Sequence, residues 1–110
     1  MKPIYLLAPA GALLSMFALA GPADQFDRGY QLAQSKGCFE CHALGYRDVG
    51  PSFRAIAQRY HLDPEHVDRL PCIIRGGSAG HWGERFVMWP QTPLTDEEVN
   101  ELVAWILSQE

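Results

Sequence analysis

The feature that most constrains this chain is the run Cys38-Phe39-Glu40-Cys41-His42. Two cysteines three residues apart lie about one helical turn from each other, so their sulfurs can bond neighbouring edges of one flat porphyrin. The next residue can then point a ring nitrogen at the iron, and neutral imidazole binds iron in both oxidation states. The pattern is typical of c-type haem attachment. We therefore expect Cys38 and Cys41 to hold one haem covalently and His42 to bind its iron.

Other chemistry for the two cysteines is less consistent with the sequence. A structural zinc site needs four ligands, so Cys72 and a distant histidine would have to complete it, and no second Cys-x-x-Cys follows. A thioredoxin-like pair needs a preceding strand, whereas the residues before Cys38 have a helical pattern. A disulfide between Cys38 and Cys41 would leave His42 without a role.

Residues 1–20 have the pattern of a secretory signal peptide. Lys2 gives a basic start, an apolar stretch runs from Ile4 to Leu19, and small residues precede Gly21. Pro9 and Gly11 interrupt the stretch, and its unbroken part is too short to span a bilayer. We expect cleavage after Ala20, a periplasmic location and no stable membrane insertion of the mature chain. Export agrees with haem attachment, because bacteria form these thioether bonds after export.

Residues 21–110 are expected to form one domain. The full chain of 110 residues has 13 acidic and 9 basic residues and a formal net charge of −4, which disfavours nucleic acid as a partner. A domain this small buries only about three-fifths of the surface that its unfolded chain exposes. A haem would add apolar area to this core, so we expect the stability of the folded protein to depend on it.

A first helix is predicted over 24–36. Phe26, Tyr30 and Ala33 recur at helical spacing on one face, and Gly37 stands at the C-terminal stop position. Gly29 inside the helix costs about 1 kcal/mol relative to alanine, which suggests that another element approaches closely there.

The last helix is the best-marked element of the sequence. Thr95 and Glu98 fit a capping box, and an apolar face follows. That face consists of Val99, Leu102, Val103 and Ile106. Trp105 adds bulk beside it, so we expect Trp105 or its neighbours to cross the first helix at Gly29.

Shorter helices are predicted between these two. One covers 52–60, and another is capped by Asp63, opens with Pro64 and ends at Gly76-Gly77. Pro71 should break the second helix into two pieces. The Gly- and Pro-rich segment 76–93 is predicted to be an extended loop, and no segment alternates as a strand. The chain is therefore expected to be all-α.

Met88 is the candidate for the second axial ligand of the iron. The other methionines, Met1 and Met16, lie in the leader, so Met88 is the only methionine of the mature chain. A thioether ligand favours ferrous iron and raises the reduction potential. His81 is the alternative sixth ligand.

Over nearly the whole mature chain, the order of these features resembles the small bacterial class I monohaem cytochromes c of the periplasm. The resemblance is carried by the haem motif after Lys36-Gly37, by Met88 followed by Pro90, and by three further stretches. These stretches are Val49-Gly50-Pro51-Ser52-Phe53, Gly77-Ser78-Ala79-Gly80-His81-Trp82-Gly83, and Leu94 to Glu98 leading into Trp105-Ile106-Leu107.

The resemblance implies a class I cytochrome c fold, four to five short helices wrapped around one covalently bound haem. It implies that the Pro51 carbonyl accepts the proton of the His42 nitrogen that faces away from iron. Trp82 would donate its indole proton to a haem propionate, or pack on the porphyrin edge. The function implied is that of a soluble one-electron carrier rather than an enzyme, serving periplasmic redox proteins such as a dehydrogenase, a reductase or a terminal oxidase.

Departures from the family pattern keep two other functions open. Trp89 stands where proline usually follows the methionine, and the loop at 84–87 is longer than in the family. A looser Met88 would allow ligand binding or peroxidase-like chemistry. The exposed aromatics expected near Trp89 and the unpaired Cys72 would instead suit a haem subunit of a dehydrogenase complex. The family often has a basic residue that contacts a propionate at the position of Ile73, which is apolar here. Arg75 is a weak substitute for that basic residue.

Overall fold

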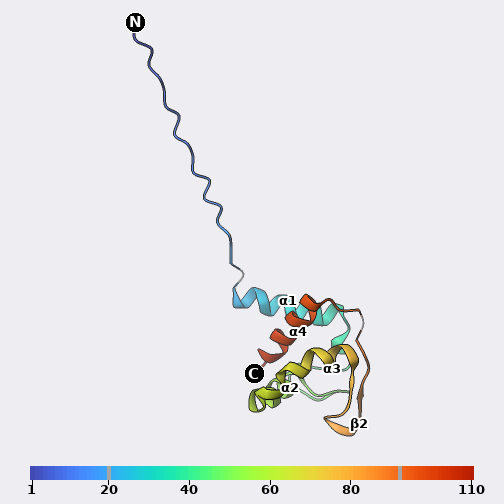
Figure 1. The fold of residues 1–110 in the computed structure, drawn as a ribbon. Coiled ribbons are helices and arrows are strands. Elements are labelled where there is room, and N and C mark those ends of the chain that lie inside the picture. Colours follow the sequence, from blue (N-terminus) through green and yellow to red (C-terminus); the bar gives the residue numbers. More distant parts are fainter. Residues whose placement is uncertain (20, 92) are drawn as a thin grey trace.

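The computed structural model describes residues 1–19, 21–91 and 93–110. Residues 1–19 are exposed, form neither helix nor strand, and extend away from the folded body (Figure 1). The expected cleavage position, Ala20, lies outside the described residues, so the boundary of the leader stays a prediction. Within the described part of the chain, each helix is too short or too polar to cross a membrane.

The folded body is mainly helical. Its elements are, in chain order, α1 (Pro22–Ser35), η1 (Cys38–Glu40), α2 (Phe53–Leu62), η2 (Pro64–Arg69), α3 (Leu70–Gly76), β1 (Ser78–Gly80), β2 (Gly83–Met88) and α4 (Asp96–Leu107), where η marks a 3₁₀ helix. Both α1 and α2 pack on α4, which therefore forms the centre of the body. The expectation of an all-α fold with short helices is confirmed.

Helix α1 crosses α4 at Gly29, as predicted. A Cβ atom built on Gly29 would overlap the side chain of Trp105, so only a hydrogen atom fits there. The Trp105 ring is 1% exposed. Its centroid lies 6.4 Å from that of Phe26 and 6.2 Å from that of Tyr30. Trp105 thus lies at the centre of the buried face of α4, rather than beside that face.

Helix α1 begins two residues before the predicted start. Pro22 occupies its first turn, where the missing N–H costs no hydrogen bond. The Asp24 carboxylate accepts a hydrogen bond of 3.0 Å from the Gly21 N–H. The helix ends at Ser35, one residue before the predicted end. Gly37 has the left-handed φ of 76° expected at the stop position.

The capping box at the start of α4 is confirmed. Thr95 Oγ1 accepts from the Glu98 N–H at 3.1 Å, and Glu98 Oε2 accepts from the Thr95 N–H at 3.1 Å. Glu98 also pairs with Lys36, at 3.3 Å between Oε2 and Nζ. The Thr95 backbone bond, with a smaller contribution from Lys36, lowers the pKa of Glu98 below its ordinary value.

Helix α2 begins at Phe53, one residue after the predicted start, and ends at Leu62, two residues after the predicted end. Ser52 Oγ caps α2 by accepting from the Ala55 N–H at 3.0 Å. The second predicted helix is broken into η2 and α3, and Pro71 lies in the first turn of α3, where proline is tolerated. The predicted cap by Asp63 was wrong: its carboxylate makes no capping bond and instead contacts His66 Nδ1 at 2.5 Å.

The predicted loop over 76–93 contains a short antiparallel hairpin, so its prediction as loop throughout was wrong. Ser78 pairs with Met88 and Ala79 with Val87. Because β1 has only three residues, it offers too short a window for an alternating pattern to be recognised. Within the described residues, this hairpin is the only sheet.

Replacing Gly29 with valine should destabilise the protein. The new side chain would collide with Trp105 at the α1–α4 crossing, and overpacking of this kind costs roughly 2–3 kcal/mol. Chemical denaturation of the haem-containing protein measures the change. Gly76→Ala is the matched control, because a Cβ at Gly76 meets nothing within 4 Å. Equal stabilities of the two variants would contradict the close crossing.

Replacing Glu98 with glutamine should flatten the acid side of the stability profile. Folding lowers the pKa of Glu98, so its contribution to stability is present above the unfolded carboxyl pKa and is lost as pH falls through the lower folded pKa. Urea unfolding from neutral into acidic pH should therefore show the wild type and Glu98→Gln converging in acid.

Candidate functional site

The end of α1 and the tight turn of η1 position the two cysteines and the histidine. Gly37 reverses the chain, and the His42 N–H then donates to the Cys38 carbonyl at 3.0 Å. Phe39, inside the motif, packs against Tyr30, Phe53 and Trp105, with ring centroids 5.3, 5.4 and 6.0 Å away. The motif is thereby anchored on the helical core through a residue for which the sequence analysis had no role.

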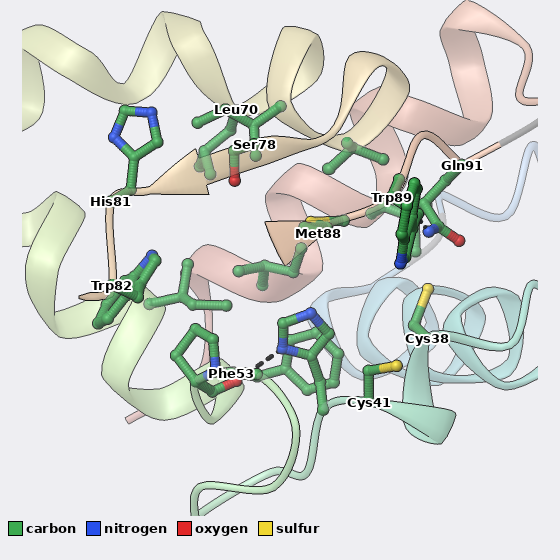
Figure 2. Close-up of a pocket in the computed structure, with 18 of the residues that line it drawn as sticks. Cys38, Cys41, Phe53, Leu70, Ser78, His81, Trp82, Met88, Trp89 and Gln91 are labelled. Atoms are coloured by element: carbon green, nitrogen blue, oxygen red, sulfur yellow. Dashed lines mark hydrogen bonds between the residues drawn. The ribbon is translucent and has the colours of Figure 1, made fainter. Parts of the chain in front are cut away.

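One cavity of about 250 Å³ brings together all six residues predicted to bind the cofactor, namely Cys38, Cys41, His42, Pro51, Trp82 and Met88. Figure 2 shows the cysteines at one end, His81 and Trp82 at the other, and Met88 between them. Most of the remaining lining is apolar, including Val49, Phe53, Ile56, Leu70, Ile73, Ile74, Phe86, Val87, Leu94, Leu102 and Ile106.

The His42 ring is held by its backbone neighbours. Its Nδ1 donates to the Pro51 carbonyl at 2.6 Å, which leaves Nε2 as the nitrogen with a free lone pair. A Cβ at Gly50 would come within 2.6 Å of the His42 ring, so the loop backbone packs directly on the imidazole. The centroid of the Phe53 ring lies 5.2 Å from that of the His42 ring. These contacts fix both the tautomer and the orientation of His42.

Met88 enters the cavity from the end of β2. Its backbone is confined, because a Cβ at Gly77 would overlap the Met88 carbonyl and Gly77 itself has a φ of 73°. His81 lines the same cavity, but its side chain is exposed, and Figure 2 shows its imidazole directed away from Met88.

Two arginines that the sequence analysis did not select hold the turn between β1 and β2. Arg59 of α2 donates to the His81 carbonyl, and its Cζ lies 4.6 Å from the Trp82 ring centroid. Arg47 donates to the Trp82 carbonyl at 3.1 Å, and its Cζ lies 4.0 Å from the Phe86 ring centroid. Contacts spanning 22 and 35 residues leave no local pattern in a single sequence.

Helix α3 carries Arg75 and Cys72, which the sequence analysis considered. Arg75, the suggested substitute for the basic residue missing at Ile73, pairs instead with the Asp96 carboxylate at the start of α4. Cys72 of the same helix is exposed, while Leu70 and Ile74 are buried.

The donor set of the cavity fits a covalently attached haem. Both thiols of the motif are free, and burial raises the pKa of Cys38 above its ordinary value, which favours a neutral thiol over a metal-binding thiolate. An imidazole and a thioether face the same mainly apolar space. Among the described residues, no three His, Cys, Asp or Glu side chains converge as a zinc site would require.

Comparison with known proteins supports the same identification. The family model described as Cytochrome c matches residues 26–110. Cytochrome c-552 of Hydrogenobacter thermophilus is 38% identical over 84% of this chain and 93% of that protein. Cytochrome c-551 of Pseudomonas aeruginosa is 32% identical over 99% of each chain.

A solved structure shows the same fold. The crystal structure of wild-type Nitrosomonas europaea cytochrome c552 matches with a TM-score of 0.67 and 32% identity, over 74% of this chain and 99% of that one. With its haem motif, its helical fold and these relatives, the chain belongs to the cytochrome c family, as a small class I monohaem cytochrome c with one covalently bound c-type haem.

Proposed function

We propose that this protein is a soluble periplasmic carrier that passes single electrons between redox partners. The observation that carries the proposal is the gathering of two thiols, an imidazole and a thioether around one mainly apolar cavity. When bound, the haem supplies an iron that gains or loses one electron while no substrate bond changes. The residues of this chain hold the group, orient the axial ligands and limit the access of water.

Cys38 and Cys41 attach the haem in this proposal. Each thiol adds across a vinyl double bond, so that the sulfur joins one vinyl carbon and the proton goes to the other. The two cysteines lie at the same end of the cavity (Figure 2), which supports bonding to neighbouring vinyl groups of one ring. Thioethers, unlike a disulfide, are not opened by cellular reductants.

His42 and Met88 are the proposed axial ligands. The bond from His42 Nδ1 to the Pro51 carbonyl supports His42, because it leaves Nε2 to bind iron and makes the imidazole a stronger donor. The confinement of the Met88 backbone against Gly77 supports a firmly held thioether. The outward direction of the His81 imidazole supports Met88 over His81.

The rim of the cavity supports the proposal that redox partners bind transiently. Val49, Val87 and Trp89 line the cavity and are 56%, 52% and 75% exposed. A small apolar rim suits brief contacts with periplasmic dehydrogenases, reductases or terminal oxidases, since weak redox encounters use small interfaces. Periplasmic location rests on the signal-peptide pattern of residues 1–20.

Covalent attachment and axial ligation can be tested together. The polypeptide, made in a host that matures c-type haem, should stay coloured after denaturation and washing with acidified acetone. Ferric protein should show the sulfur-to-iron charge-transfer band at the red edge of its spectrum. The band should be lost in Met88→Ala and kept in His81→Ala. A colourless washed polypeptide would refute the proposal.

Carbon monoxide distinguishes a carrier from a ligand-binding or peroxidase-like protein. If Met88 is held firmly, the ferrous spectrum should not change when carbon monoxide is added at neutral pH, whereas Met88→Ala should bind the gas. Binding by the wild type would favour the labile-ligand alternative. Chromatographic size from the native source separates a free carrier from a subunit of a dehydrogenase complex.

Replacing Gly50 with alanine should disturb His42. The added Cβ would collide with the imidazole and displace it from the Pro51 carbonyl, at a cost of roughly 1–3 kcal/mol for overpacking. Denaturation of the haem-containing protein and the NMR signal of the Nδ1 proton measure the change. Gly45→Ala, in the same loop, contacts only the flexible end of Arg54 and should change stability by less than about 0.5 kcal/mol.

A further inference from the structure

A haem brings two propionate carboxylates into this mainly apolar cavity, and their charges require compensation. In the porphyrin ring, the pyrroles that carry vinyl groups lie opposite those that carry propionates. If Cys38 and Cys41 hold the vinyl groups, the propionates lie across the ring from them. Figure 2 shows His81 and Trp82 at that far end. The end of the cavity formed by the β1–β2 turn is therefore where cations are needed.

The family's basic position at Ile73 and the basic residues Lys36 and Arg75 do not supply this positive charge. Ile73 lines the cavity as an apolar residue, and Lys36 lines it next to the cysteine Cys38. Lys36 is paired with Glu98 at 3.3 Å, and Arg75 is paired with Asp96.

Arg59 stands at the required place. Its guanidinium lies over the Trp82 ring, with Cζ 4.6 Å from the ring centroid, and it donates to the His81 carbonyl. A guanidinium has five N–H donors, so these contacts leave others for a carboxylate. The contact with Trp82 also brings the charge to the wall of the haem cavity.

A second cavity, of about 140 Å³, adjoins the first at this point. Tyr60, Ile73 and His81 line both cavities and so form their shared wall. The rest of the second cavity is lined by Arg59, Arg69, His66 and Asp63. Two arginines outweigh one carboxylate, and the Asp63 carboxylate already contacts His66 Nδ1 at 2.5 Å. The second cavity is therefore electropositive.

We propose that the second cavity is the carboxylate subsite of the haem, in which Arg59, supported by Arg69, binds a propionate. This proposal rests on the proposed attachment of haem to Cys38 and Cys41. In this proposal the positive charge that compensates the propionate comes from Arg59 of α2 and Arg69 of η2. Ile73 and Arg75 of α3 do not supply it. Arg47 contributes indirectly, because it donates a hydrogen bond to the Trp82 carbonyl and so holds Trp82 in place.

Proton NMR of the ferrous holoprotein tests the contact directly. Nuclear Overhauser effects are expected between the methylene protons of one propionate and the side-chain protons of Arg59 and Trp82. If these effects are absent, the proposal is overturned.

The midpoint potential of the holoprotein supplies a second readout. Oxidation adds one positive charge at the iron, so a nearby cation raises the potential, and its removal should lower it. Arg59→Gln should therefore shift the potential downward, while Arg59→Lys, which keeps the charge, should restore most of it. Arg54→Gln is the matched control, because Arg54 lies on the same helix and lines neither cavity. Equal shifts in Arg59→Gln and Arg54→Gln would overturn the proposal.

Two further measurements decide the cases that the Arg59 variants leave open. Arg69→Gln leaves the contacts of Arg59 with the β1–β2 turn in place, so it can be measured even if Arg59→Gln fails to fold. A lower midpoint potential in Arg69→Gln supports the subsite, and an unchanged potential overturns it. A wild-type potential that changes with inorganic phosphate at constant ionic strength would mean that a free anion occupies the cavity, which also overturns the proposal. Covalently bound haem in every variant separates these results from a failure of the haem assignment itself.

Discussion

The contact between Gly29 and Trp105 is the constraint on which the rest of the structure depends. It lets α1 approach α4 closely enough for Trp105 to pack against Phe39, whose ring centroid is 6.0 Å away, and Phe53, 4.8 Å away. Phe39 belongs to the haem motif, and Phe53 begins the helix that follows the His42 loop. A single helix crossing thus anchors both segments that form the cysteine and histidine side of the cavity.

Much of this arrangement could be predicted because its causes are local. The haem motif, the cap at Thr95 and Glu98, and the stop at Gly37 each depend on residues within four positions of one another. The crossing at Gly29 was predictable because a glycine inside a helix lowers its stability, which suggests that another element approaches closely there. The β1–β2 hairpin could not be predicted because β1 is too short to show an alternating pattern. The two arginines that hold its turn could not be predicted because their contacts join segments 22 and 35 residues apart. The Asp63 cap failed because His66 is a competing partner for the same carboxylate.

The cavity has two chemically different ends. Around the cysteines, the contacts are aromatic and come from α1, η1 and α4. Around Trp82, they come from guanidinium groups of α2 and of the loop before it, which reach carbonyls and ring faces of the hairpin. Substitutions at the first end should affect assembly, whereas those at the second should adjust the electrostatic environment of an assembled protein.

The partner of the His42 ring is a main-chain oxygen, and this limits how the site can diverge. No side-chain replacement can delete the Pro51 carbonyl, so the electron-donating strength of the imidazole is inherited with the shape of the loop. Related chains that keep this backbone path would share that property even where their surfaces have diverged. Variation among them would then have to enter through the hairpin that carries Met88.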